Sequence, residues 1–185
     1  MLVAPTLAAQ TKLPKANPEF LSEDGTRAVV SPVAAAEGVA SHESRINIYT
    51  QHGDKVCSLD FSSEDGEHGQ TVAKAAWTAD GNLFVFSLDN SGGHPPRSHP
   101  TLFVSFKKYA PGSNPQVCLL DSYLDNPGIT TSDFQLSAPN SVTTRIYEAS
   151  TDVTVSLSEI TSQVPLKGKS RCVPCEGAKT VRFWP

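Results

Sequence analysis

An internal repeat constrains the fold of this chain more than any other feature. The segment from Phe20 to Val30 returns, in the pattern of its apolar and turn residues, as Ala76 to Phe86, 56 positions later. Further along, Lys55–Asp60 returns as Gln116–Asp121, now 61 positions apart, and the extra residues fall between two predicted strands. A repeat that holds its spacing in the strands and changes length in a turn indicates a structural unit copied along the chain.

Each copy contains a strong hairpin signal. Asp24-Gly25 and Asp80-Gly81 both stand between apolar runs, and such a pair tolerates the positive φ angles of a tight turn. Two successive hairpins per copy predict four antiparallel strands in each of two units, 19–63 and 72–124. The continuous apolar run Leu83–Phe86 predicts a strand that is covered on both faces.

The rest of the chain is divided by the same reasoning. Val142–Tyr147 and Val153–Leu157 predict a third hairpin in a partial unit, 132–162, so that 19–162 forms a single all-β domain. Residues 1–18 are expected to be an unstructured lead-in, interpreted as the remnant of an export signal because small residues precede Ala9-Gln10. Residues 163–185 have no periodic pattern and are expected to form a loosely ordered tail.

The turns of the two full units resemble those of a known family. Ser22-Glu23-Asp24-Gly25 and Thr78-Ala79-Asp80-Gly81 are similar to the Ser-Pro-Asp-Gly turn of WD40-like blades in TolB-type periplasmic β-propellers. The resemblance implies antiparallel, blade-like, four-stranded sheets in an incomplete propeller-like arrangement. A β-sandwich or distorted barrel is the alternative. An open arrangement would leave an apolar sheet face uncovered, which predicts a protein partner or self-association.

Four cysteines are interpreted by position. Cys57 and Cys118 occupy equivalent strand positions, and equivalent positions in stacked sheets lie roughly 10 Å apart, beyond the ~7 Å that a disulfide spans. We therefore expect both to be buried as small hydrophobic residues. Cys172 and Cys175 lack the partners of a zinc site and the context of a redox motif, so a local disulfide or two free thiols is expected.

The candidate functional residues are in two loops. The first loop, 62–70, contains Glu64, Asp65, Glu67 and His68, and the second, 89–100, contains His94, Arg97 and His99. Loops on a rigid scaffold often carry binding residues, and these groups could also bind a divalent metal. The alternative is a solvated acidic turn and an exposed, proline-stiffened connection.

The sequence also excludes several classes of function. A net charge of −4 argues against nucleic-acid binding, and the chain has no apolar stretch long enough to span a membrane. It has no nucleophile elbow and no glycine-rich phosphate loop. The sequence therefore favours a periplasmic or secreted binding module that acts on a ligand or protein, without a cofactor and without enzymatic activity. A metal-binding protein or hydrolase that uses the loop residues, and a structural remnant of a larger propeller, are the alternatives.

Overall fold

The computed structural model describes residues 17–34, 40–92, 99–106, 114–124, 129, 131–146, 152–162, 172–175 and 180–182. These residues form an all-β protein of three sheets. The strands are β1 Glu19–Leu21, β2 Arg27–Ala34, β3 Ala40–Tyr49, β4 Lys55–Asp60, β5 Gln70–Trp77, β6 Leu83–Asn90, β7 Thr101–Ser105, β8 Gln116–Leu119, β9 Gln135–Ser137, β10 Ser141–Arg145, β11 Asp152–Ser156, β12 Cys172–Pro174 and β13 Thr180–Arg182. A 3-10 helix, η2 (Leu120–Tyr123), and a short helix, α1 (Leu157–Ser162), complete the described elements.

The two repeat units fold as predicted. Strands β1 to β4 lie in chain order in the first sheet, and β5 to β8 lie in chain order in the second; within each of these two sets, neighbouring strands pair antiparallel. The predicted hairpin on β10 and β11 is also confirmed, and with β9 it forms the third sheet. Strand β2 continues to Ala34, and β3 begins at Ala40.

The repeated turns share a hydrogen-bonding pattern. Ser22 Oγ donates to Asp24, and Thr78 Oγ1 donates to Asp80 Oδ1 over 2.6 Å. Gly25 and Gly81 that follow have φ angles of 83° and 66°, a region that glycine enters without the steric cost of a Cβ atom. The hydroxyl–carboxylate pair and the glycine together explain why both copies keep this motif.

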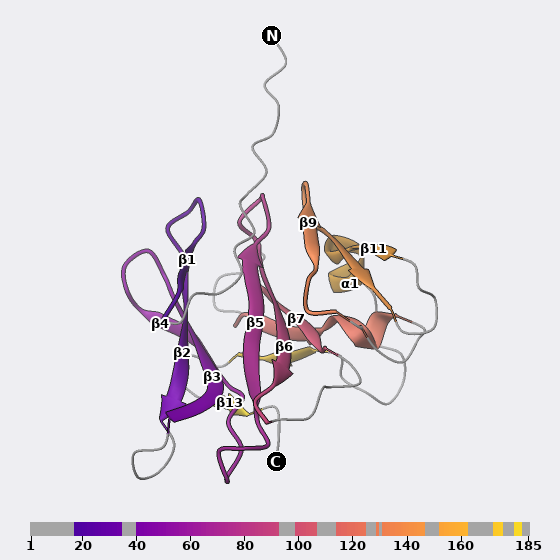
Figure 1. Cartoon of the computed structure of the whole chain (residues 1–185). Helices are drawn as coiled ribbons and strands as arrows, with labels where there is room; N and C mark the ends of the chain where they lie inside the picture. Colours follow the sequence, from indigo (N-terminus) through magenta and orange to yellow (C-terminus); the bar gives the residue numbers. More distant parts are fainter. Residues whose placement is uncertain are drawn as a thin grey trace.

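The three sheets stack face to face in chain order, with the second sheet in the middle (Figure 1). We call the apolar layer between the first and second sheets the first interlayer, and that between the second and third sheets the second interlayer. Phe84 and Phe86 of β6 pack in the first interlayer, whereas Val85 packs in the second. The prediction that this strand is covered on both faces is therefore confirmed. Ile129, Phe134, Val142, Leu157 and Ile160 supply the outer side of the second interlayer.

The register of the repeat differs from a constant spacing. A constant spacing of 56 residues would match Ile48 with Val104. In the structure, Ile48 pairs with Cys57, and Phe103 pairs with the equivalent cysteine, Cys118. Ile48 therefore corresponds to Phe103. One cause is the turn between the first two strands, which encloses five residues between Leu21 and Arg27 but six between Trp77 and Phe84. Alternate residues of a strand face opposite sides of the sheet. One extra residue in the turn therefore moves each side chain of the following strand to the opposite face.

The C-terminal part of the chain pairs with both full units. Strand β12 adds antiparallel to β8 at the edge of the second sheet, and β13 adds parallel to β4 at the edge of the first. These strands differ from the loosely ordered tail that the sequence predicted for residues 163–185. An uncovered edge strand presents unpaired backbone groups to other chains, and these two short strands cover the β4 and β8 edges.

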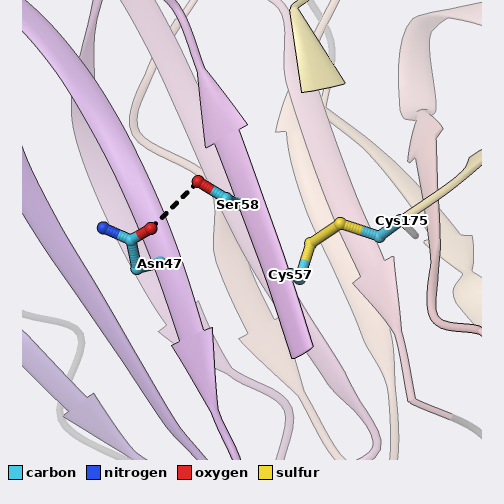
Figure 2. The surroundings of a disulfide bond; sticks show 4 residues. All are labelled: Asn47, Cys57, Ser58 and Cys175. Carbon is cyan, nitrogen blue, oxygen red and sulfur yellow. Dashed lines mark hydrogen bonds between the residues drawn. A yellow bond between two sulfur atoms is a disulfide. The ribbon is translucent and has the colours of Figure 1, made fainter. Parts of the chain in front are cut away.

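The cysteine pairing corrects the sequence interpretation. Cys57 bonds to Cys175, and Cys118 bonds to Cys172, with Cα–Cα distances of 5.4 and 4.1 Å. The predicted separation concerned Cys57 and Cys118, which indeed do not bond to each other. The prediction of a local disulfide or two free thiols at Cys172 and Cys175 is wrong, because this segment runs past the edges of both sheets and each cysteine bonds to a different one. Figure 2 shows Cys175 reaching the strand that carries Cys57, beside the hydrogen bond from Ser58 Oγ to Asn47 Oδ1.

The outward faces of the first and third sheets each carry an ion pair, and the half-buried Val29 and Tyr49 also lie on the outward face of the first sheet. On the first, Arg45 pairs with Asp60 over 2.7 Å; on the third, Arg145 pairs with Asp152 over 3.1 Å. Leu21 is the one large hydrophobic side chain exposed among the described residues. An extensive exposed apolar face, as expected of an open arrangement, is thus not seen among the described residues. None of the described helices is long and apolar enough to cross a membrane.

Candidate functional site

The first candidate loop, residues 62–70, joins β4 of the first sheet to β5 of the second, and we call it the acidic loop. It lies at the start of β5, whereas the Asp80-Gly81 turn follows the end of that strand. The turns of the three sheets gather at that other end, since Asn140 Nδ2 lies 3.4 Å from Asp80 Oδ2 and Gly81 lies beside Ser22. The acidic loop is therefore a separate surface from the repeated turns.

A buried carboxylate organises the acidic loop. Glu43 of β3 is 1% exposed and accepts hydrogen bonds from the backbone N–H of Ser63 over 3.1 Å and of Gly69 over 2.7 Å. The Ser63 hydroxyl lies 2.5 Å from Glu43 Oε1. Both ends of the loop are therefore fixed to a strand of the first sheet, and the burial of the carboxylate is offset by these donors. The role of Glu43 is not visible in the sequence, because its partners lie 20 and 26 residues away.

Gly69 is required by this anchor. A Cβ atom at this position would collide with the Glu43 carboxyl group and with the carbonyl oxygen of Phe61. The backbone of the loop therefore approaches Glu43 as closely as only glycine permits.

Asp65 and His68 form a pair on the exposed side of the loop. The backbone N–H of Glu67, the Ser63 hydroxyl and the His68 ring surround the Asp65 carboxylate, and these hydrogen bonds hold the pKa of Asp65 far below its usual value. The hydrogen bond to Asp65 and its negative charge raise the pKa of His68. The His68 side chain is 80% exposed, so the pair presents itself to solvent on an ordered loop.

The same residues do not have the geometry of a serine hydrolase. A catalytic serine donates its hydroxyl to an imidazole nitrogen. The Ser63 hydroxyl instead lies 2.8 Å from Asp65 Oδ1 and beside Glu43, and it accepts the backbone N–H of His68 over 3.1 Å. The arrangement stabilises a loop and does not activate a nucleophile.

The second candidate loop lies against the first at its beginning. Ser91 Oγ lies 2.9 Å from the carbonyl oxygen of Gly69, to which it donates, and 3.2 Å from that of Glu67. At its end, His99 Nδ1 lies 3.8 Å from Asp89 Oδ1 and is buried without a hydrogen bond. His94 and Arg97 lie outside the described residues. Glu64, Asp65, Glu67 and His68 therefore share one loop, while His99 lies beside Asp89 without a hydrogen bond to it.

Two carboxylates that repeat between the units have different environments. Burial alone would raise the pKa of Asp60, but hydrogen bonds from Ser62 and Arg45 outweigh it and lower that pKa. Burial raises the pKa of Asp121, despite backbone N–H donors from Thr101 and Ile129. Asp60 forms an ion pair with Arg45. Asp121 instead connects Thr101 of β7 with Ile129, which precedes the third sheet.

Two hollows lie on other parts of the molecule. One, of about 220 Å³, is lined by polar residues around Asp133 and Arg145; another, of about 370 Å³, lies between β1 and the end of β5 beside Trp77. Neither includes a residue of the acidic loop. Within the described ranges, no group of three His, Cys, Asp or Glu side chains is placed to hold a metal ion.

Comparison of the chain with protein families, with curated proteins and with solved structures finds no match.

Proposed function

We propose that this protein is an exported binding module that uses the acidic loop to bind a positively charged segment of a protein partner. The observation that carries the proposal is the fixed loop itself. Glu43 anchors both of its ends, and the loop exposes Glu64, Asp65 and Glu67 to solvent. A rigid acidic surface binds cations with little loss of conformational entropy, and charge complementarity speeds association with a basic segment.

The cysteines support export. Every one of the four is in a disulfide, and the two bonds join segments 118 and 54 residues apart. Structural disulfides of this kind form and persist in the periplasm or outside the cell, and are rare in the cytosol. We therefore assign the protein to the periplasm or the extracellular space.

We further propose that the three sheets are blade-like units related to those of TolB-type propellers. The hydroxyl-x-Asp-Gly turns of the first two sheets and the face-to-face stacking in chain order support this relationship. The described residues form three sheets, so the stack would act as a short array and not as a ring.

The binding proposal is tested with a pair of matched variants. Glu64→Gln/Glu67→Gln removes two exposed carboxylates from the acidic loop, and Glu23→Gln/Asp54→Asn removes two exposed carboxylates from the opposite end of the sheets. Both variants change the net charge equally. The probe is a fluorescent oligolysine peptide, and binding is measured by anisotropy at low and at physiological salt.

The wild type and the opposite-end variant should bind the peptide, and the loop variant should bind it at least about tenfold more weakly, with a smaller salt dependence. Equal weakening by both variants would mean that only net charge matters, and would overturn the proposal. Elemental analysis of protein purified without chelator tests the metal-binding alternative, which requires a stoichiometric ion.

A further inference from the structure

We propose that residues 172–175, Cys-Val-Pro-Cys, are a thiol-operated clamp with two alternative disulfide states. In the clamped state, Cys175 bonds to Cys57 and Cys172 bonds to Cys118, as the structure shows. In the released state, Cys172 and Cys175 bond to each other, and the thiols of Cys57 and Cys118 are free. The chain thereby attaches or detaches its C-terminal strands from both repeat units.

The two states exclude each other because of where the clamp lies. Cys175 is part of the first interlayer, whereas Cys172 packs at the second, so the two side chains point into different layers. Three extended residues also place Cα atoms up to about 10 Å apart, and a disulfide needs them within about 7 Å. A Cys172–Cys175 bond therefore requires β12 to leave its partner β8.

Accessibility decides which bond opens first. Cys57 and Cys175 are both completely buried, whereas Cys172 is partly exposed and its Sγ lies 3.2 Å from the Tyr123 hydroxyl. Thiol–disulfide exchange requires a thiolate to reach a sulfur atom, so an external dithiol attacks Cys172 before it can reach either sulfur of the other bond.

The exchange balances as a two-electron reduction. A dithiol attacks Cys172 Sγ, the Cys118 sulfur leaves as a thiolate, and the second thiol of the reagent closes its own disulfide and releases the Cys172 thiolate. The Cys172 thiolate then attacks Cys175 Sγ, forming the local bond, and the Cys57 sulfur leaves and takes up a proton. One dithiol is oxidised, two inter-segment disulfides are lost and one local disulfide is formed.

The consequence of release is the exposure of two strand edges. In the clamped state β12 covers β8 and β13 covers β4. After release both edges present backbone groups that can pair with an extended segment of another chain. The clamp thus connects the redox state of the surroundings to the availability of two pairing surfaces.

Two single substitutions test the exchange step. Cys118→Ala and Cys172→Ala remove the same disulfide, but only Cys118→Ala keeps the thiol of Cys172. Each oxidised protein is incubated with dilute dithiothreitol, and the release of the Cys57 thiol is followed by maleimide labelling and mass spectrometry. We expect Cys57 to be released at least about tenfold faster in Cys118→Ala, with a Cys172–Cys175 bond in the product. Equal rates in the two variants would overturn the proposal.

A measurement on the unmodified protein does not depend on whether the variants fold. Wild-type protein is partially reduced with dithiothreitol, trapped with N-ethylmaleimide and mapped by mass spectrometry. The proposal predicts an intermediate labelled at Cys57 and Cys118, with Cys172 and Cys175 linked to each other. An intermediate that retains Cys57–Cys175 or Cys118–Cys172 as its single disulfide, with no local bond at any time, would contradict it.

Discussion

Removal of the Cys57–Cys175 bond should lower the free energy of unfolding by about 4 kcal/mol. The two cysteines are 118 residues apart, but the Cys118–Cys172 bond shortens the path between them. The remaining loop runs 61 residues from Cys57 to Cys118 and 3 from Cys172 to Cys175, about 64 in all. Chain-entropy arguments give about 4.3 kcal/mol at 25 °C for closing such a loop in the unfolded chain.

The variant for this test is Cys57→Ala/Cys175→Ala, which leaves no unpaired thiol and no buried hydroxyl. Unfolding in guanidinium chloride is followed by fluorescence, for which Trp77 is a suitable probe because it is largely buried in the first interlayer. A loss of about 4 kcal/mol corresponds to a decrease in melting temperature of about 8–16 °C for a chain of this size.

Cys118→Ala/Cys172→Ala is the matched control. With the other bond in place, Cys118 and Cys172 are already joined by two parallel paths, of 54 and about 64 residues, which act together as a loop of about 29 residues. Removal of this bond should therefore cost about 3.6 kcal/mol by the same relation. Both variants should therefore be destabilised to a similar extent, although the sequence separations differ twofold. A loss below about 1 kcal/mol for Cys57→Ala/Cys175→Ala would refute the reasoning that this bond restricts the unfolded chain.

Three further predictions concern single carboxylates. Glu43→Ala should cost about 2–3 kcal/mol and expose the Gly69 amide to hydrogen exchange, because it leaves buried N–H groups unpaired; unchanged protection would contradict the anchor role. Asp65→Asn should lower the pKa of His68 towards the ordinary histidine value in an NMR titration, and an unchanged pKa would disprove the pairing. Asp60→Asn should cost about 1–2 kcal/mol at pH 7. Because the folded pKa of Asp60 is lowered, its stabilisation is present above the unfolded value of about 3.9 and is lost on further acidification. The difference between variant and wild type should therefore shrink below about pH 4, and a difference that persists there would argue against the Arg45–Asp60 pair.

The features that could be predicted from the sequence are those whose cause is local. The Asp24-Gly25 and Asp80-Gly81 turns, the strands beside them and the doubly covered run Leu83–Phe86 follow from alternation and turn chemistry within a few residues. The hairpin of β10 and β11 follows from the density of valine and threonine. The strand register of the second unit could not be predicted in this way. A single extra residue in one turn changes which side chains of the next strand face a given interlayer.

The features that could not be predicted depend on distant segments. Strands β12 and β13 have three residues each, which is too few for a periodic pattern, and they exist because the edges of β4 and β8 pair with them. The disulfide partners of Cys172 and Cys175 lie in different sheets, so their spacing of three residues suggested a local bond. Glu43 had no visible role in the sequence for the same reason, because the acidic loop that it anchors meets it only in the folded chain.

The central structural conclusion is that one C-terminal segment is bonded to both repeat units. Trypsin places Cys57, Cys118 and the Cys172–Cys175 segment on three different peptides, since lysine or arginine residues separate them. Mass spectrometry of the unreduced digest should detect these three peptides as a single linked species, and fragmentation between Val173 and Pro174 should assign Cys118 to Cys172 and Cys57 to Cys175. For protein that has not been exposed to a reducing thiol, a digest in which the Cys172–Cys175 peptide carries its own internal disulfide, with Cys57 and Cys118 free or joined to each other, would contradict the structure.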